Sequence, residues 1–493
     1  MLLKTMKTAA GCARGRCGWP AFGMAAAALS AFAASAAFAQ SPPGAVTQAA
    51  LQAPAAPGTV AAASPSAMPE SEIRSRLDST GGLTAGGEKL HIGLLRQFYA
   101  AHNYEPVWPT HVKQAEALLA DVMRAWSHGL DPELFHAAVL RKPAALPPID
   151  RDLLLSDAFL AYADALARGA MPIEVRMDDE DLKPEPVDVP AMLDKAIASP
   201  DPAAVIEALA PSTSTYQALR RALQAYRAGG EEAAAAPAGN HPAARPTEAH
   251  LRQLVANLER QRWLPRKLPA ERVWVDIVPE QLTLYKDDRP VFTTKIVVGE
   301  ADKQSPEVET TISGVQFNPP WNVPRSIITE EIMPKLSRDP DYLSRHHMVM
   351  RHNGLIQQLP GPHAALGQIK FEMPNRFDVY LHDTPQKYLF ARDNRRQSHG
   401  CIRVQNPREL AALLLDQPAE AVAKAIGLGY TNSRPLPAPV PVFIVYQTAV
   451  AQPDGAIAFR PDPYERDIEI WQHLHPREQA PVAEHEQPGQ RRG

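Results

Sequence analysis

The sequence predicts an α+β protein in which an α-helical domain comes first and a β-rich domain follows. Three observations carry this prediction. The chain has 493 residues, more than one hydrophobic core usually organises, so at least two folded units are expected. Apolar residues recur at helical spacing up to about residue 228. From residue 273 onward they recur at every second position, as in strands.

The helical domain is expected over residues 72–228. One helix is predicted before Gly129, a typical helix stop, because apolar residues there fill a single face: Leu118, Leu119, Val122, Met123 and Trp126. Asp131 and Pro132 then fit an N-cap followed by proline at the first helical position. A second helix ends near Gly169 and carries Leu155, Phe159, Tyr162, Ala163 and Leu166. The domain's aromatic residues could line a groove, but their spacing favours core packing: Phe98, Tyr99, Tyr104, Trp108 and Trp126.

The β-rich domain is expected over residues 247–447, after a short helix around Leu254. Strands are predicted where apolar residues alternate, first at Val273, Val275 and Ile277, and later in the run 440–446. Helices are expected around 327–337 and 407–415. Residues 448–477 are predicted to be a C-terminal extension that packs on this second domain.

The first 39 residues are predicted to be a secretory signal peptide. A basic start is followed by an apolar run at 21–39, and Ala37-Phe38-Ala39 fits cleavage after a small residue. The alternative is an uncleaved anchor, since the run approaches the length that spans a bilayer. Its alanine-rich, weakly hydrophobic composition favours cleavage, which would leave no stable membrane insertion. Either way the bulk of the chain is expected in the periplasm.

Three segments are predicted to be linkers or tails. Residues 40–71 and 229–246 are rich in Ala and Pro without periodicity, and residues 478–493 are rich in Gln, Pro and Arg. The 49 prolines against 27 glycines fit such segments. The formal charge of −4, with basic and acidic residues spread along the chain, gives no basic stripe for a phosphate backbone. Nucleic acid is therefore not an expected partner.

The cysteines point to one residue. Cys12 and Cys17 lie inside the predicted signal, so the processed chain would keep only Cys401, which has no disulfide partner within the chain. A lone cysteine in an oxidising compartment is either buried and inert or used for chemistry. The residues around Cys401 favour a chemical role for its thiol.

The densest chemical signal is the run Ser398-His399-Gly400-Cys401-Ile402-Arg403-Val404, preceded by Tyr380-Leu381-His382-Asp383. A thiol attacks well only as a thiolate, so its pKa of about 8.5 must be lowered or a base must take its proton. Histidine is the usual base. Gly400 permits close backbone approach, and the amides near it could stabilise an oxyanion. Arg403 could bind a substrate carboxylate or pair with a structural acid.

These motifs resemble the signature of the L,D-transpeptidase family (YkuD-type catalytic domain), in which an upstream histidine is followed by Ser/Thr-His-Gly-Cys. Further blocks resemble its large multidomain branch, which has an N-terminal helical scaffold domain: 317–324, 366–371 and 380–385. The resemblance implies a β-sandwich-like catalytic domain and an active-site cap at about 325–365. It implies Cys401 as nucleophile, His382 as base, and His399 with Gly400 in the surrounding shell and oxyanion hole.

The resemblance also implies the substrate and its contacts. Substrate-binding residues are expected at Arg403, Ser398, Tyr380, Trp321 and Asn318. The commoner family motif has asparagine at the position of Arg403, whereas arginine is similar to the large branch. The peptidoglycan-binding module that the large enzymes often carry is expected to be missing, with the linker at 229–246 in its place. No cofactor or metal is expected, because the cap histidines His346, His347 and His352 lack a recognised zinc spacing.

The implied reaction is attack by the cysteine on the L,D bond of a peptidoglycan tetrapeptide stem. D-alanine leaves, and the acyl group passes to the side-chain amine of a second stem, giving a 3-3 cross-link in cell wall biogenesis. The partners are thus donor and acceptor stems, with cell-wall synthesis proteins as a further class. The alternative is an L,D-carboxypeptidase or endopeptidase-type hydrolase that uses the same acyl-enzyme. A catalytically silent wall-binding protein is disfavoured by the retained cysteine, histidine and glycine.

Strand geometry distinguishes the two histidines. His399 lies two residues from Cys401, so on one strand their side chains would run parallel, a poor geometry for a hydrogen bond. His382 comes from another segment, and an adjacent strand can place it opposite Cys401. The Asp383 side chain points away in an extended chain, so a backbone carbonyl, that of Asp383 itself, is the expected acceptor for the His382 ring. A carboxylate triad is not expected.

Overall fold

The computed structural model describes residues 71–79, 81–174, 176, 180–228 and 247–475. The predicted signal peptide at 1–39, the linker at 229–246 and the tail at 478–493 lie outside these ranges, as does the linker at 40–71 apart from Ser71. None of the helices within the described ranges is both long enough and apolar enough to cross a bilayer.

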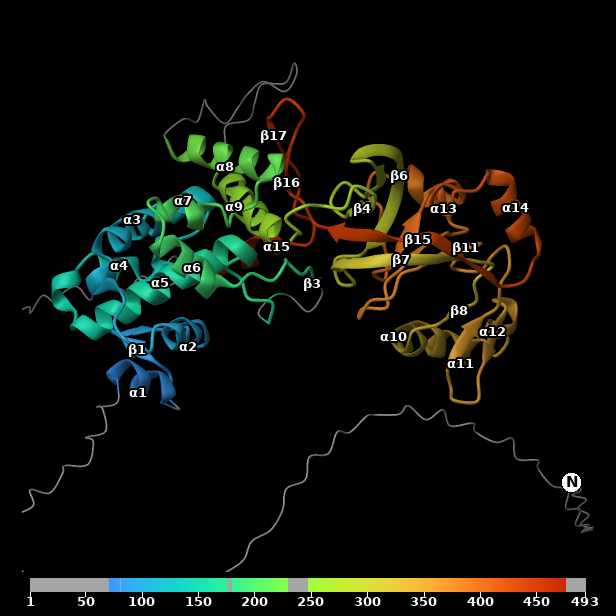
Figure 1. Ribbon diagram of the computed structural model, residues 1–493. Coiled ribbons are helices and arrows are strands. Elements are labelled where there is room, and N and C mark those ends of the chain that lie inside the picture. Colours follow the sequence, from blue (N-terminus) through green and yellow to red (C-terminus); the bar gives the residue numbers. More distant parts are fainter. Residues whose placement is uncertain (1–70, 80, 175, 177–179, 229–246, 476–493) are drawn as a thin grey trace, which may run out of the picture. The chain divides into compact units, whose positions relative to one another are not determined.

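The first part of the chain is helical, as predicted (Figure 1). Its short pieces are the hairpin of β1 (Thr84–Ala85) and β2 (Glu88–Lys89) and several 3₁₀ turns. Its α-helices are α1 (Glu72–Asp78), α2 (Ile92–Ala101), α3 (Val112–Val122), α4 (Ala137–Leu140), α5 (Pro148–Arg168), α6 (Val189–Ile197), α7 (Pro202–Glu207), α8 (Ser214–Arg227) and α9 (Glu248–Arg262).

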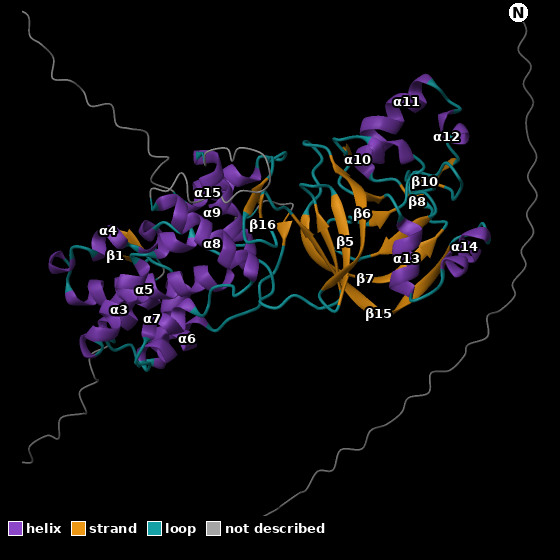
Figure 2. Ribbon diagram, turned by 90° about the horizontal axis from the view of Figure 1, so that it is seen from above, coloured by secondary structure: helices purple, strands orange, loops and turns teal. Residues whose placement is uncertain are grey.

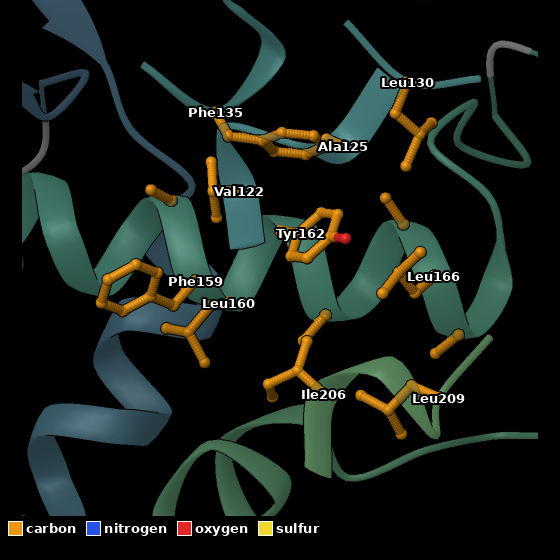
Figure 3. Packing of buried hydrophobic residues seen from close by; sticks show 14 of the residues in the cluster. Val122, Ala125, Leu130, Phe135, Phe159, Leu160, Tyr162, Leu166, Ile206 and Leu209 are labelled. Carbon is orange, nitrogen blue, oxygen red and sulfur yellow. The ribbon is translucent and has the colours of Figure 1, made fainter. Parts of the chain in front are cut away.

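Helix α5 is the centre of this part. Most of its 21 residues are buried, and Figure 3 shows Phe159, Tyr162 and Leu166 packed among side chains from neighbouring elements, including Val122 and Ile206. The buried residues include the polar Asp152, Ser156 and Asp157 as well as the apolar ones, so neighbouring elements cover this helix on nearly every side. Of the aromatic residues predicted to be core, three are buried and two, Tyr104 and Trp126, are half-buried.

The predicted helix before Gly129 is two elements in the structure. Helix α3 ends at Val122, and a separate 3₁₀ turn, Ala125–His128, leads to Gly129. Gly129 adopts φ +76°, the left-handed conformation expected of a glycine stop. The Asp131 side chain accepts a hydrogen bond from the Glu133 N–H at 2.9 Å, which confirms the predicted N-cap, although the turn that follows is 3₁₀.

The second part is β-rich, as predicted, and its main sheet closes on itself. The strand order is β11-β12-β14-β6-β5-β4-β15-β7, and β7 also pairs with β11. The inward faces therefore enclose one core, a more specific arrangement than a sandwich-like one. These strands are β4 (Arg272–Asp276), β5 (Gln281–Lys286), β6 (Arg289–Gly299), β7 (Glu307–Phe317), β11 (Ile369–Glu372), β12 (Leu381–His382), β14 (Ile402–Val404) and β15 (Asn432–Val445). Two short strands are attached to the sheet: β3 (Glu180–Asp181) on β7 and β13 (Arg396–Ser398) on β6.

The predicted helices of this part are present. Helix α13 spans Pro407–Leu415, and α14 (Ala419–Gly427) follows it. The expected helix at 327–337 consists of α10 (Arg325–Ile327), a π-helical turn at Ile328–Ile332 and α11 (Met333–Arg338). Together with α12 (Tyr342–Arg345), β8 (Trp321–Asn322), β9 (Met348–Met350) and β10 (Ile356–Gln358), these elements form the predicted cap insertion (Figure 2). The cap has a small core of its own: Val323, Ile328, Ile332 and Ile356.

Two domain boundaries differ from the prediction. Helix α9, placed at the start of the β-rich domain, buries Leu254 and Leu258 in the helical core. The C-terminal extension also joins that core instead of packing only on the β-rich domain. Its helix α15 (Arg466–Leu474) buries Ile470, Trp471 and Leu474 in the helical core. These residues are one to four positions apart, so they lie on one face of the helix, which packs against α9. The extension's other elements are β16 (Ala449–Ala451) and β17 (Ile457–Phe459).

Candidate active site

Two adjacent parallel strands bring the predicted site residues together. In β12 and β14, Leu381 pairs with Ile402 and His382 pairs with Arg403. Leu381 and Ile402 are fully buried in the core, so the residues on either side of them in the chain point to the opposite face. Those residues are Tyr380, His382, Cys401 and Arg403, and all four line a cleft of about 540 Å³.

The loop before β14 is held by its own hydrogen bonds. The Ser398 hydroxyl donates to the Cys401 carbonyl at 2.7 Å and accepts from the Gly400 N–H at 3.3 Å. Gly400 adopts φ +104°, and a Cβ there would lie 3.2 Å from the Gln304 carbonyl oxygen, so glycine suits the position. The structure records no acceptor for the Cys401 N–H among the described residues. That amide, more than the Gly400 N–H, is therefore available to an oxyanion.

The Cys401 thiol lies beside Tyr380 and Trp321 in the cleft and is directed at the Asp378 backbone carbonyl, with 4.0 Å between sulfur and oxygen. Burial raises the pKa of the thiol, while the Tyr380 hydrogen bonds and the nearby charges of Lys370 and Arg403 oppose the rise. The net direction is upward, so the resting site holds a thiol. Burial also raises the pKa of Tyr380, which keeps its hydroxyl proton available for donation.

His382 is almost fully buried and neutral. Burial, and then the positive charge of Arg403, lower its pKa to about 3. Its Nδ1 lies 2.5 Å from the Asp383 backbone carbonyl, which can only accept, so Nδ1 carries the proton and Nε2 is free to take one. This confirms the predicted carbonyl acceptor. The Asp383 carboxylate is held elsewhere, by the Gln368 N–H at 2.9 Å and the Lys387 ammonium at 2.7 Å.

The register of the two strands corrects one expectation. The sequence predicts His382 opposite Cys401, but its partner is Arg403, so His382 is diagonal to Cys401 across the strand pair. The pairing of Leu381 with Ile402 puts Tyr380, and not His382, level with Cys401. Both side chains still line the same cleft.

His399 connects the loop to the cap. Its Nε2 lies 2.5 Å from a carboxylate oxygen of Glu331, which belongs to the π-helical turn at Ile328–Ile332. The other Glu331 oxygen lies 3.6 Å from the Lys335 ammonium. Both the His399 and the Glu331 side chains are about one-third exposed, at 34% each, and both line the cleft.

The remaining predicted substrate contacts divide into two groups. Trp321, Tyr380 and Arg403 line the cleft, and Arg403 donates to the Gln386 side chain at 2.6 Å. No salt bridge of Arg403 to an acid is recorded in the part of the chain that the structure describes. Asn318 is wrong as a cleft residue, because its buried amide donates to the Ile426 carbonyl at 2.9 Å and serves the packing of α14. Ser398 lines the cleft, but its hydroxyl is used within the loop.

Several residues in or next to the cleft were not found from the sequence. Lys370 pairs with His382 across β11 and β12, and its ammonium lies 4.0 Å from the centre of the Tyr380 ring. Its position between buried Ile369 and Phe371 would have indicated that it faces the other side of the sheet. No local pattern marks the others, which come from the cap turn and from the segment 386–397: Glu331, Gln386, Tyr388, Arg392 and Gln397.

Two hollows slightly larger than the cleft lack its chemistry. One, of about 640 Å³, lies beside α13, and the other, of about 620 Å³, lies in the helical part near α5. Neither is lined by a cysteine, the residue type that supplies the nucleophile in the cleft. Within the described ranges, no group of three or more His, Cys, Asp or Glu side chains is arranged to hold a metal ion. The convergence of a thiol, an imidazole and a free amide N–H is found in the cleft, and this set suits acyl transfer through a covalent intermediate.

Comparison with known proteins agrees with this chemistry. Residues 270–441 match the family model described as the L,D-transpeptidase catalytic domain (YkuD), and residues 93–223 match a Scaffold domain. A Haemophilus influenzae protein named "Putative L,D-transpeptidase" is 31% identical over 241 residues, which are 44% of this chain and 48% of that protein. The chain thus covers about half the length of this curated relative.

Similar solved structures are also L,D-transpeptidases. One is the enzyme from Mycobacterium smegmatis, with 14% identity, a TM-score of 0.20, and coverage of 36% of this chain and 58% of that one. Another is the catalytic domain from E. faecium acylated by ertapenem, with 14% identity, a TM-score of 0.21, and coverage of 36% and 99%.

The second part of the chain matches the L,D-transpeptidase catalytic domain of the YkuD type, and its cleft holds the thiol and imidazole described above. This match follows a match to an N-terminal Scaffold domain, the combination that the sequence motifs predicted.

Proposed function

We propose that the protein is a periplasmic, cysteine-dependent L,D-transpeptidase that forms 3-3 cross-links between peptidoglycan stems. The observation that carries the proposal is the placement of the Cys401 thiol and the unprotonated Nε2 of His382 in one cleft. Periplasmic location is supported by the basic, then apolar, N-terminal sequence.

In the donor half of the reaction, His382 takes the thiol proton as sulfur attacks the carbonyl carbon of the L,D bond. Because the resting pair is neutral, proton transfer accompanies attack and does not precede it. The Cys401 N–H donates to the oxyanion. The C–N bond then breaks, D-alanine leaves as an amine with a proton from His382, and a thioester remains on Cys401.

In the acceptor half, the amine of a second stem forms a new amide and the C–S bond breaks. Arg403 supports binding of a carboxylate of the stem, since no structural acid neutralises it among the described residues. The Trp321 indole and the Tyr380 ring give the stem an apolar wall next to the thiol.

The test is the product spectrum. Purified residues 40–493 are incubated with disaccharide-tetrapeptides, and the muropeptides are analysed by mass spectrometry. The proposal expects free D-alanine together with 3-3 cross-linked dimers that reach a substantial share of the product. Tripeptides without dimers would assign the hydrolase instead, and unchanged tetrapeptides would overturn both functions.

A further inference from the structure

The cleft contains a second imidazole that the donor half of the reaction does not use. His399 lies two residues before Cys401, lines the same cleft, and contacts Glu331 of the cap. His382 already has the position and the free ring nitrogen that the thiol requires. The pairing of His399 with a carboxylate on a different structural element therefore needs its own explanation.

Glu331 fixes the tautomer of His399. A carboxylate accepts hydrogen bonds, so the 2.5 Å contact places a proton on Nε2. In the neutral ring Nδ1 is then the unprotonated nitrogen, and the structure records no partner for it in the ranges it describes. Glu331 is itself held by Lys335 at 3.6 Å. The result is an oriented, partly exposed base at the wall of the cleft.

The acceptor half of the reaction needs such a base. An alkyl amine like that of lysine has a pKa of about 10.4 and is an ammonium ion at neutral pH. It cannot attack a thioester until it loses a proton. His382 is poorly placed to meet an incoming ammonium ion, because it is buried and the cationic Arg403 lies opposite it. His399 has solvent access and an anionic neighbour that attracts an ammonium.

We infer that His399 is the base of the acceptor half-reaction and that Glu331 is the residue that positions it and attracts the acceptor ammonium. This inference rests on the proposed function. Nδ1 of His399 takes one proton from the ammonium and passes it to solvent. The neutral amine attacks the thioester carbon, the N–C bond forms, the C–S bond breaks, and the second amine proton passes through His382 to the departing thiolate. Protons and charge balance without an added reactant.

The cap gives a matched pair of variants for the test. Glu331→Gln removes the carboxylate that contacts His399, whereas Glu330→Gln removes its neighbour, which lies 3.7 Å from Lys303 and does not line the cleft. His399→Gln removes the base. For each purified protein, the rate of acylation by a carbapenem and the rate at which a tetrapeptide donor and a diamino-acid acceptor form product are measured separately, with thermal stability as a control.

The expected result is a split between the two halves. Glu331→Gln and His399→Gln should lower amine transfer about tenfold or more relative to acylation, a loss in the range of general-base effects. Glu330→Gln should change neither rate by more than about twofold. The share of product lost to hydrolysis should rise in the first two variants, because water competes for a thioester that amine resolves slowly.

A second measurement uses acceptors that need no base. Hydroxylamine is neutral at the assay pH, so it should restore transfer in His399→Gln and Glu331→Gln to near the parent rate. If hydroxylamine and the ammonium acceptor are affected equally, or if all three variants lower both half-reactions alike, the role of His399 is wrong. If the parent protein is not acylated and forms no cross-links, the proposed function itself fails. This outcome can be told apart from a failure of the His399 role, in which the parent protein is active.

Discussion

The two histidines of the cleft have the same side chain and opposite surroundings. His382 is 4% exposed, hydrogen-bonded to a backbone carbonyl, and placed by a strand of the closed sheet. His399 has a side chain that is 34% exposed, contacts a carboxylate, and lies in a loop that reaches the cap. Burial lowers the pKa of the first ring and keeps it neutral, whereas the second ring is open to water. The sheet and the loop before β14 thus place two imidazoles with different surroundings in one cleft.

The first and largest effect expected is loss of the nucleophile. Replacement of Cys401 by alanine should abolish covalent modification, because no other cysteine is present in residues 40–493. The parent should gain the mass of one carbapenem molecule per chain, measured by intact-protein mass spectrometry. If Cys401→Ala acquires the same mass, another residue carries the acyl group and the comparison of two bases around this thiol has no basis.

Loss of the buried histidine should come next. His382→Ala should lower the rate of acylation by about 10²- to 10⁴-fold, the usual size of a general-base effect. Asp383→Asn is the control, since its carboxylate contacts Gln368 and Lys387 and not the ring, and it should lower the rate far less. Stopped-flow acylation rates with thermal unfolding measured in parallel decide the matter. If His382→Ala is acylated as fast as the parent, or if Asp383→Asn alone is not acylated, His382 is not the base.

Much of this site was predictable from the sequence. The Ser-His-Gly-Cys run, the upstream His382 and the preference for a backbone carbonyl at Nδ1 follow from residue types and from the two-residue period of strands. The order of helical and β-rich parts follows from the change of hydrophobic period. These features depend on neighbours within a few residues, where the sequence is most informative.

The features that were missed depend on distant residues. The closure of the sheet by β7 and β11 joins residues more than fifty positions apart, and no local pattern encodes it. Glu331 reaches His399 because residues 328–332 form a π-helical turn, which the sequence does not mark. Asn318 was predicted as a substrate contact from the family resemblance, yet its amide donates to the Ile426 carbonyl near the end of α14. The C-terminal extension was predicted to pack on the β-rich domain, but its helix α15 buries Ile470, Trp471 and Leu474 in the helical core.

The third prediction concerns the pH dependence of the thiol. Burial raises the pKa of Cys401 above its ordinary value, and neutral His382 offers no stabilising imidazolium charge. Alkylation by iodoacetamide should therefore rise about tenfold per pH unit between pH 7 and 9, about 100-fold in all, without a plateau at low pH. Alkylation rates followed by mass spectrometry test this. A rate that is constant from pH 6 to 8 would indicate a preformed thiolate-imidazolium pair and would overturn the neutral resting state.

The smallest effect expected is on stability in acid, and it tests the buried histidine without any substrate. The pKa of His382 is about 3 in the folded protein and about 6.5 when the ring is in water, so the unfolded chain binds a proton that the folded protein refuses. The stability linked to this group is fully present above pH 6.5 and is lost as the pH falls toward 3. The loss should amount to a few kcal/mol, because a tenfold change in proton affinity corresponds to about 1.36 kcal/mol. His128, whose pKa burial lowers to about 4, adds to the same trend from the helical part.

The measurement is the slope of the unfolding free energy against pH between 6 and 4, obtained from urea titrations. His382→Gln should reduce this slope by about one proton, since glutamine cannot be protonated, even if the variant is less stable at every pH. His128→Gln should remove a similar amount. If His382→Gln keeps the parental slope, the buried ring does not resist protonation in the folded protein, and the neutral state assigned to it is wrong.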